Sequence, residues 1–260
     1  MNSDCDPLPG HQAVEQIMGM PIIVDVRDDV DRRAMTRVFD WFRAVDRTFS
    51  TYKPDSVISR LDSGALDPTE APAAVREVLE LCEHARKTTL GYFDVRATGR
   101  LDPSGLVKGW AVDRAARLLE EEGAANYTIS AGGDLVAKGD ALPGGGWRIG
   151  LQHPLDERSL MWSFDTTDAS VATSGAYVRG QHVLDPHSQR PPTGLLSVTI
   201  AGPELATADI YATAAFAMGE AATRWVTTLA PYEALVVDDD ERVLTTPGFP
   251  AADRGIVELV

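Results

Sequence analysis

Tyr127-Thr-Ile-Ser130 is the first of a series of short β-prone runs that continues as far as Ala201. The other runs are Trp147-Arg-Ile-Gly-Leu151, Met161-Trp-Ser-Phe164, Ser170-Val-Ala-Thr173, Val183-Leu184 and Ser197-Val-Thr-Ile-Ala201. Each run is short and apolar, and turn-forming residues separate it from the next, which predicts a strand at each position. We therefore expect the middle of the chain to form sheet.

Helical periodicity dominates the chain before this stretch. Apolar residues at three- and four-residue spacing form a stripe along residues 30–49, as a helix buried on one side requires. Further helices are predicted through Val57 to Gly64, over 73–88 and over 107–122. Beyond Ala201, the remaining predicted elements are helices at 206–218 and 220–229 and closing strands at 234–237 and 256–260.

Helices and strands are not strictly interleaved, although residues 21–26 add a strand near the start. This order favours an α+β fold over a doubly wound parallel sheet. The 260 residues, 44% of them hydrophobic, are enough for one large domain or two intimate lobes. No repeat or linker divides them.

Charge and composition exclude several classes of partner. The formal charge is −15, from 24 Lys and Arg against 39 Asp and Glu. A surface that binds nucleic acid or an anionic membrane needs clustered cations, so neither partner is expected. No apolar run reaches the length of about 18 residues that a membrane span requires. The N-terminal residues are acidic and carry no signal-peptide pattern, so we expect a cytoplasmic protein.

Ala206-Thr-Ala-Asp-Ile-Tyr-Ala-Thr-Ala-Ala-Phe-Ala-Met218 is a small-residue segment that carries one carboxylate, Asp209, and one hydroxyl, Thr213. Their four-residue spacing places two oxygen donors on one helix face. Mg²⁺ prefers oxygen ligands and leaves positions open for phosphates, so the pair indicates a metal that assists phosphoanhydride cleavage. The alternative is an acid near a helix N-terminus and a threonine that hydrogen-bonds its own preceding turn.

A second segment, Asp102-Pro-Ser-Gly-Leu-Val-Lys-Gly109, brings an acid, a lysine and two glycines to the predicted start of a helix. Free N–H groups and the positive end of the helix dipole favour a phosphate there. The alternative is a capped helix start with an exposed Lys108.

Two glycine-containing segments lie at strand ends. In Gly132-Gly133-Asp134, the paired glycines allow main chain to pass close to a ligand, although an ordinary tight turn uses the same residues. In Ala172-Thr-Ser-Gly175, Ser174 is a candidate donor to a phosphate, or alternatively a hydroxyl that caps a turn.

Together with His182-Val-Leu-Asp-Pro186, these segments resemble the ApbE family, the Mg²⁺-dependent FAD:protein FMN transferases. The stretch from Phe49 to Leu61 is similar to the segment that opens the flavin-nucleotide pocket in that family. The resemblance implies a two-lobed single α+β domain over residues 18–260, with helices on largely antiparallel sheets. Residues 1–17 would form an N-terminal extension.

The resemblance also implies a set of site residues. Lys108 would lie against the flavin nucleotide, and His182 would assist proton transfer, since a histidine titrates near working pH. Structural or solvated roles are the alternatives for His182, and turn roles for Tyr52 and Asp185. The implied metal site contains Gly105, Asp209, Ala212 and Thr213. The implied flavin-nucleotide site contains Met18, Tyr52, Asp94, Asp102, Lys108, Gly132, Gly133, Asp134, Ser174, Val183 and Asp185.

The implied activity is transfer of the FMN moiety of FAD to a Thr or Ser hydroxyl of an acceptor flavoprotein, with release of AMP. The acceptor would present a Ser/Thr-Gly-Ala-Ser/Thr type motif. Two alternatives remain open: an FAD pyrophosphatase that yields FMN and AMP, and a non-catalytic FAD-binding protein.

Overall fold

The computed structural model describes residues 10–175, 183–252 and 257–258. Its α-helices are α1 (Arg32–Phe49), α2 (Val57–Asp62), α3 (Ala73–Thr88), α4 (Ser104–Glu121), α6 (Leu205–Met218) and α7 (Ala222–Trp225). Its strands are β1 (His11–Ile17), β2 (Met20–Val26), β3 (Tyr127–Ala131), β4 (Asp134–Lys138), β5 (Trp147–His153), β6 (Asp156–Thr166), β7 (Asp168–Gly175), β8 (Leu195–Gly202), β9 (Glu233–Asp238), β10 (Val243–Thr245) and β11 (Val257–Glu258).

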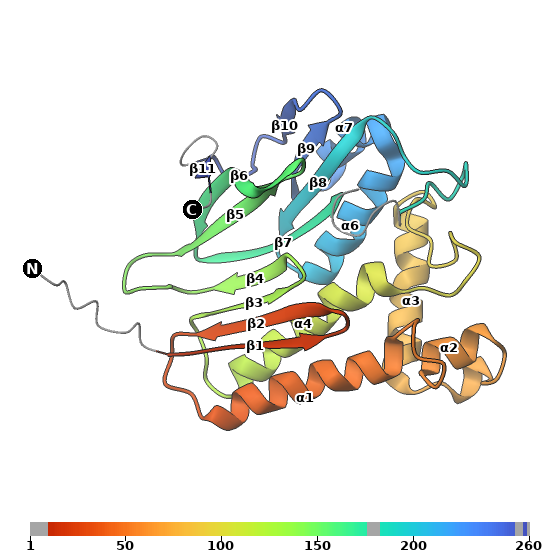
Figure 1. Cartoon of the computed structure of the whole chain (residues 1–260), viewed down its shortest axis with the longest axis horizontal. Coiled ribbons are helices and arrows are strands. Elements are labelled where there is room, and N and C mark those ends of the chain that lie inside the picture. Colours follow the sequence, from red (N-terminus) through yellow and green to blue (C-terminus); the bar gives the residue numbers. More distant parts are fainter. Residues whose placement is uncertain (1–9, 176–182, 253–256, 259–260) are drawn as a thin grey trace, which may run out of the picture.

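The strands form two sheets. The larger is 8-stranded in the order β1-β2-β3-β4-β7-β8-β9-β10, and the smaller is 3-stranded in the order β11-β6-β5 (Figure 1). Every pairing between described strands is antiparallel. The α+β prediction with antiparallel sheets is therefore confirmed.

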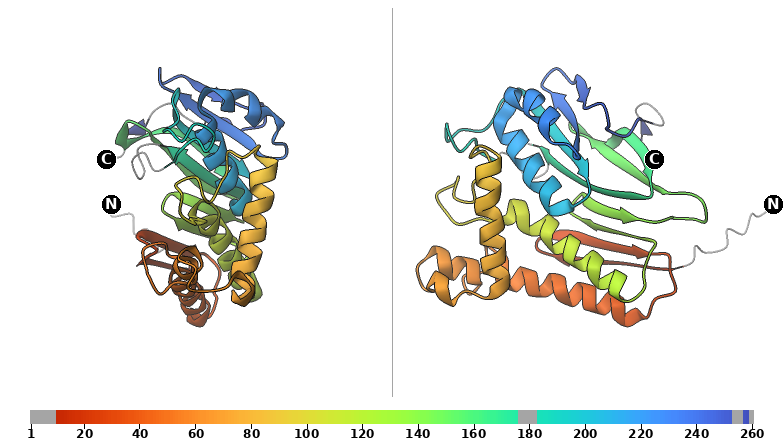
Figure 2. Two further views of the ribbon diagram at one scale, coloured as in Figure 1. Left: turned by 90° about the vertical axis from the view of Figure 1, so that its right-hand side faces the viewer. Right: turned by 180° about the vertical axis from the view of Figure 1, so that it is seen from behind.

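The central strands of the large sheet are covered on both faces. Helices α1, α4 and α6 lie on one face, and the views from the side and from behind agree on this layering (Figure 2). The small sheet packs on the other face, where its Trp147, Ile149 and Phe164 share a core cluster with Leu235 and Val237 of β9. Because alternate side chains point to opposite faces, strands covered on both sides bury consecutive apolar residues.

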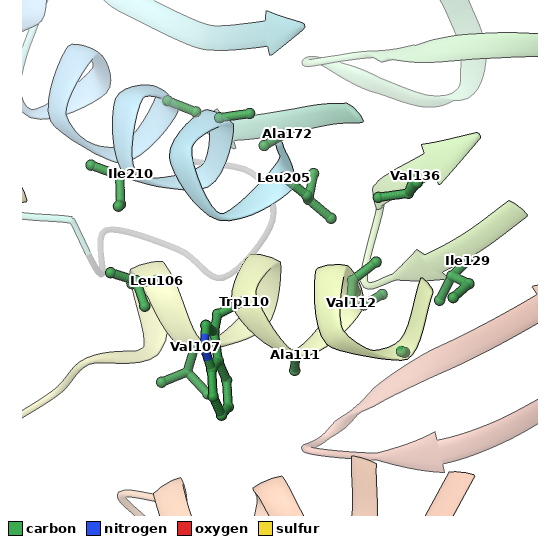
Figure 3. Packing of buried hydrophobic residues seen from close by; sticks show 14 of the residues in the cluster. Leu106, Val107, Trp110, Ala111, Val112, Ile129, Val136, Ala172, Leu205 and Ile210 are labelled. Atoms are coloured by element: carbon green, nitrogen blue, oxygen red, sulfur yellow. The ribbon is translucent and has the colours of Figure 1, made fainter. Parts of the chain in front are cut away.

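Helix α4 lies at the centre of the helical layer. Figure 3 shows its Leu106, Val107, Trp110, Ala111 and Val112 among buried side chains from the sheet and from α6. The helix is apolar around much of its circumference because it is packed on several sides. Its position brings the Asp102 segment and the Asp209 helix together.

Two contacts fix α6 against α4. A Cβ added at Gly109 would lie 2.6 Å from the carbonyl oxygen of Leu205, so only glycine permits this close approach. The N–H groups of Leu205 and Ala206 donate to the Asp113 carboxylate at 3.1 and 2.8 Å. An acid from α4 thus caps the first turn of α6 and complements its dipole.

Several predicted elements differ from the structure. Residues 183–184 form no strand, so that prediction is wrong; the chain there leads into a turn at Asp185-Pro186. The predicted helix 220–229 is wrong in form, because only α7 is α-helical and the 3₁₀ turns η2 (Gly219–Ala221) and η3 (Val226–Thr228) flank it. The hydroxyls of Thr227 and Thr228 donate to carbonyls three residues back, which competes with a continuing α-helix.

The chain also contains strands that the sequence analysis missed, notably β1, β4 and β10. Residues 11–17, placed ahead of the predicted domain, form β1 and pair with β2 along its full length. The sequence of β1, His11-Gln-Ala-Val-Glu-Gln-Ile17, has three apolar residues and no alternation of polar and apolar positions, so it lacks the pattern that predicts a strand. No described helix combines the length and apolar character that crossing a bilayer requires.

Candidate active site

A cavity of about 600 Å³ opens where α4, α6 and the ends of β3 and β7 meet. We call it the first cavity. Its volume is within the range of small-molecule sites. Its lining includes many of the candidate residues: Met18, Tyr52, Asp94, Asp102, Gly105, Lys108, Gly132, Ser174, Val183, Asp209 and Thr213.

The start of α4 forms one wall. The Asp102 carboxylate accepts the Ser104 N–H at 3.0 Å, which is the capping role considered for this acid. Gly105 and Lys108 lie one turn apart and both face the cavity. A Cβ at Gly105 would lie 3.3 Å from Thr213 Oγ1, so the absence of a side chain keeps this space open. The same helix start is therefore both capped and exposed to a ligand.

Helix α6 contributes Asp209 and Thr213 to the same cavity, as their four-residue spacing predicts. Thr213 Oγ1 lies 3.5 Å from Ser174 Oγ at the end of β7. Asp209 is only 2% exposed and accepts the Gly109 N–H at 3.2 Å through Oδ2. One carboxylate and two hydroxyls from two elements thus converge at this wall.

Lys108 lies between two buried carboxylates. Its Nζ is 2.5 Å from Asp134 Oδ2 and 3.5 Å from Asp209 Oδ1. Among the described residues, Asp134 Oδ2 has no hydrogen-bond donor. Its contact with Lys108 Nζ is therefore an ion pair. Burial raises the pKa of Asp209 above its usual range against the lowering effect of Lys108, and Asp134 raises it further.

These residues fit a bound Mg²⁺. Asp134, Lys108 and Asp209 together carry one more negative charge than positive when all are ionised, and burial makes that excess costly. A divalent cation would offset it, and the carboxylate and hydroxyl oxygens are of the type that Mg²⁺ prefers. Among the described residues, no three His, Cys, Asp or Glu side chains form a cation site by themselves. A metal here would depend on hydroxyl, carbonyl or substrate oxygens as well.

The loop after α1 forms the rim. Ser56 donates its hydroxyl to the Ser50 carbonyl at 2.6 Å and caps α2 by accepting the Ser59 N–H at 3.0 Å. Tyr52 belongs to this loop and lines the first cavity with 95% of its surface exposed. An exposed aromatic ring at a cavity mouth suits stacking on a planar ligand.

The structure does not bring every candidate to the first cavity. Gly133 and Asp134 line an adjoining cavity instead, although Asp134 contacts Lys108. Ala212 is fully buried in α6. Asp185 accepts the His187 N–H at 2.8 Å in a turn, while Val183 beside it does line the first cavity. His182 lies outside the described residues.

Sequence reasoning missed two contributors. Thr173 lines the first cavity, and its N–H donates to Asp134 Oδ1 at 3.1 Å. Asp113 positions α6 from outside the cavity. Thr173 stands beside the recognised Ser174 and could have been found from that segment, whereas no local pattern signals that Asp113 caps a distant helix.

The antiparallel α+β fold has a cavity that joins a helix start, a buried acid–lysine cluster and converging hydroxyls, and these are features that suit a phosphate-bearing ligand. A family model described as the ApbE family matches residues 18–99 and 95–236. These matches span most of the chain, so the chain belongs to the ApbE family.

Curated relatives support the same family. An FAD:protein FMN transferase of Vibrio cholerae serotype O1 is 31% identical over 210 residues, which cover 69% of this chain and 63% of that protein. An FAD:protein FMN transferase of Salmonella typhimurium is 36% identical over 129 residues, or 46% of this chain and 37% of that protein. The aligned part of the chain thus spans less than two thirds of either relative.

Solved structures show the same fold. The flavin transferase ApbE from Vibrio cholerae superposes with a TM-score of 0.82 at 23% identity, covering 94% of this chain and 99% of that one. An ApbE protein from Thermotoga maritima superposes with a TM-score of 0.83 at 20% identity, covering 92% and 98%. The fold is therefore that of ApbE proteins over nearly the whole chain.

Proposed function

We propose that this protein is an Mg²⁺-dependent FAD:protein FMN transferase. The observation that carries the proposal is the convergence of Asp209, Thr213 and Lys108 on one cavity at the start of α4. The names of the Vibrio and Salmonella relatives support the same activity. The substrate would be FAD, and the acceptor a flavoprotein with a Ser/Thr-Gly-Ala-Ser/Thr type motif.

In the proposed reaction, a Ser or Thr hydroxyl oxygen of the acceptor attacks the FMN-side phosphorus of FAD. The bond from that phosphorus to the bridging oxygen breaks, and AMP leaves with the bridging oxygen. FMN remains on the acceptor as a phosphoester. The hydroxyl proton passes to a base, for which His182 is the predicted group.

The described residues would bind and orient the pyrophosphate. Lys108 supplies a positive charge and the start of α4 supplies the positive end of the helix dipole, which would favour phosphate at this wall despite a net charge of −15. Asp209, Thr213 and Gly105 are the proposed holders of Mg²⁺. The metal would supply charge neutralisation on the phosphates. Tyr52 and Met18, which line the first cavity, are the residues proposed to cover the flavin ring.

The test is incubation of the purified chain with FAD, Mg²⁺ and an acceptor domain that contains the motif. Covalent flavin is read by fluorescence in a denaturing gel, and AMP by chromatography. We expect equal amounts of both products, and none after chelation of the metal. Asp209→Asn should lower the rate on the order of 10²-fold or more, as loss of a charge-stabilising group at a reacting centre does.

Asp168→Asn is the matched control, because Asp168 is an exposed carboxylate that pairs with Lys138 outside the first cavity. It should react like the unaltered protein. Release of AMP and free FMN without acceptor labelling would instead identify a pyrophosphatase. FAD binding without either product would identify a binding protein.

A further inference from the structure

A second cavity, of about 690 Å³, adjoins the first. Gly132 and Thr173 line both, so the two spaces meet at these residues. The rest of its wall comes from the β3–β4 turn and from the β5–β6 hairpin: Gly133, Asp134, Gly150, Leu151, Gln152, His153, Pro154, Leu155, Glu157 and Leu160.

The second cavity follows the edge of β5. The strand residues Gly150 to His153 are consecutive and all line it. The register of β5 against β6 shifts between Leu151 and His153, so the strand is irregular where it borders the cavity, and Glu157 and Leu160 of β6 line the cavity as well. Within the described part of the chain β5 pairs with β6 alone, which leaves its other edge open to an added strand.

One part of the cavity wall is low in side-chain bulk. Gly132 and Gly133 form the β3–β4 turn, and a Cβ built at Gly133 would meet nothing within 4 Å. Glycines at such positions let another main chain approach closely. The groove therefore leaves room for the main chain of an extended segment.

The groove also leads to the acid–lysine cluster. Asp134 lines the second cavity, yet its Oδ2 lies 2.5 Å from Nζ of Lys108, which lines the first. The Thr173 N–H holds the other Asp134 oxygen at 3.1 Å. A hydroxyl carried by a segment in the groove would arrive beside this cluster.

We propose that the second cavity is the docking groove for the acceptor protein. The acceptor binds as an extended, small-residue segment added to the edge of β5, and its Ser or Thr hydroxyl reaches the first cavity past Gly132 and Thr173. This inference rests on the proposed function, because it requires FAD in the first cavity.

The test measures binding of the peptide and binding of FAD separately. A fluorescein-labelled synthetic peptide with a Ser-Gly-Ala-Thr core is titrated by fluorescence anisotropy in the presence of FAD and Mg²⁺, and the affinity for FAD is measured by calorimetry. Gln152→Trp places bulk in the groove and Leu155→Asp adds charge at its exposed end. Each should weaken peptide binding about tenfold or more, with the affinity for FAD unchanged.

Arg148→Trp is the matched control, since Arg148 lies on the same strand and the same exposed side as Gln152 but does not line the groove. It should bind peptide normally. A peptide N-methylated at alternate backbone nitrogens should bind weakly, because strand addition uses main-chain hydrogen bonds.

The docking groove is refuted if the unaltered protein does not bind the peptide, or if both groove variants bind it with unchanged affinity. Groove-dependent peptide binding without FMN transfer would leave the docking site standing and overturn the proposed transferase activity. The two failures are therefore distinguishable.

Discussion

Single carboxylates in this protein act according to the donors around them. Asp113 satisfies two N–H groups at a helix start, whereas Asp209 lies in the first cavity beside Lys108. Asp28 joins two loops: it accepts the N–H groups of Ala125 and Asn126 and the Asn126 side-chain amide, each at 2.7 Å. An aspartate thus caps a helix in one place, lines the first cavity in another and joins two loops in a third.

The pH dependence of the free energy of unfolding tests the role of Asp28. Burial alone would raise the pKa of Asp28, but the bonds from Asn126 and Ala125 outweigh it and the pKa is lowered. A lowered pKa in the folded state stabilises the fold above the unfolded value, near 4, and that contribution disappears as pH falls through the folded value. Asp28→Ala should lower the free energy of unfolding at pH 7 by about 1–3 kcal/mol.

Urea denaturation across pH checks this expectation. The difference between the unaltered protein and Asp28→Ala should be constant above about pH 5 and should shrink below about pH 4. Asp29→Ala removes the same charge from an exposed neighbour and should cost little. If the difference in free energy of unfolding stayed constant down to pH 3, this would contradict the proposed role of Asp28 in joining the two loops.

At the scale of elements, the crossing of α4 and α6 builds the site. Gly109 sets how closely the helices approach, and Gly105, one turn earlier, keeps the space beside Thr213 open. Helix α4 begins at the first cavity, and α6 crosses α4 beside it. Side chains of both helices therefore line that cavity. Small residues at the crossing are therefore a structural requirement and a condition for the site.

Alanine substitutions at two glycines of α4 separate the structural requirement from the requirement of the site. Gly109→Ala should destabilise the fold by about 1–3 kcal/mol or more, because the new Cβ would meet the backbone of α6. Gly105→Ala should leave stability close to unchanged, since its contacts are with side chains and alanine favours a helix by about 0.5–1 kcal/mol over glycine. It should nevertheless weaken FAD binding. Thermal unfolding and calorimetry measure the two effects, and equal loss of stability in both variants would contradict the distinction.

At the scale of the whole molecule, the described residues form one continuous fold rather than separable parts. Strands β4, β7, β8 and β9 bury residues on both faces, so the helical layer and the small sheet share the same central strands. Such an arrangement should unfold cooperatively. Ligands that bind only the folded state should then stabilise the whole chain.

A metal-dependent shift in the unfolding temperature tests whether ligand binding stabilises the whole chain. FAD with Mg²⁺ at about 100 times the dissociation constant adds about 2.7 kcal/mol, or roughly 5–10 °C for a chain of this size. Without ligand, Asp209→Asn should be at least as stable as the unaltered protein, because it removes a buried excess negative charge. It should lose the Mg²⁺-dependent part of the shift. An equal shift with and without Mg²⁺ in the unaltered protein would argue against the metal.

Helices and part of the site could be predicted because they depend on neighbours in the chain. The stripe on 30–49 and the boundaries of 73–88 match α1 and α3 closely. Strand β4 was missed because it follows directly on the Gly132-Gly133 turn, and β1 because its polar and apolar residues come in pairs rather than alternating. The segment 220–229 was misjudged because threonine hydroxyls compete for its backbone.

The sequence alone determined the charge, the α+β order and the placement of Asp209 and Thr213 on one helix face, since composition and helical spacing are local properties. Only the tertiary structure decided that Asp134, Lys108 and Asp209 form one cluster and that two cavities share Gly132 and Thr173. These contacts join residues far apart in the chain. They arise from the packing of the whole core, which no local pattern encodes.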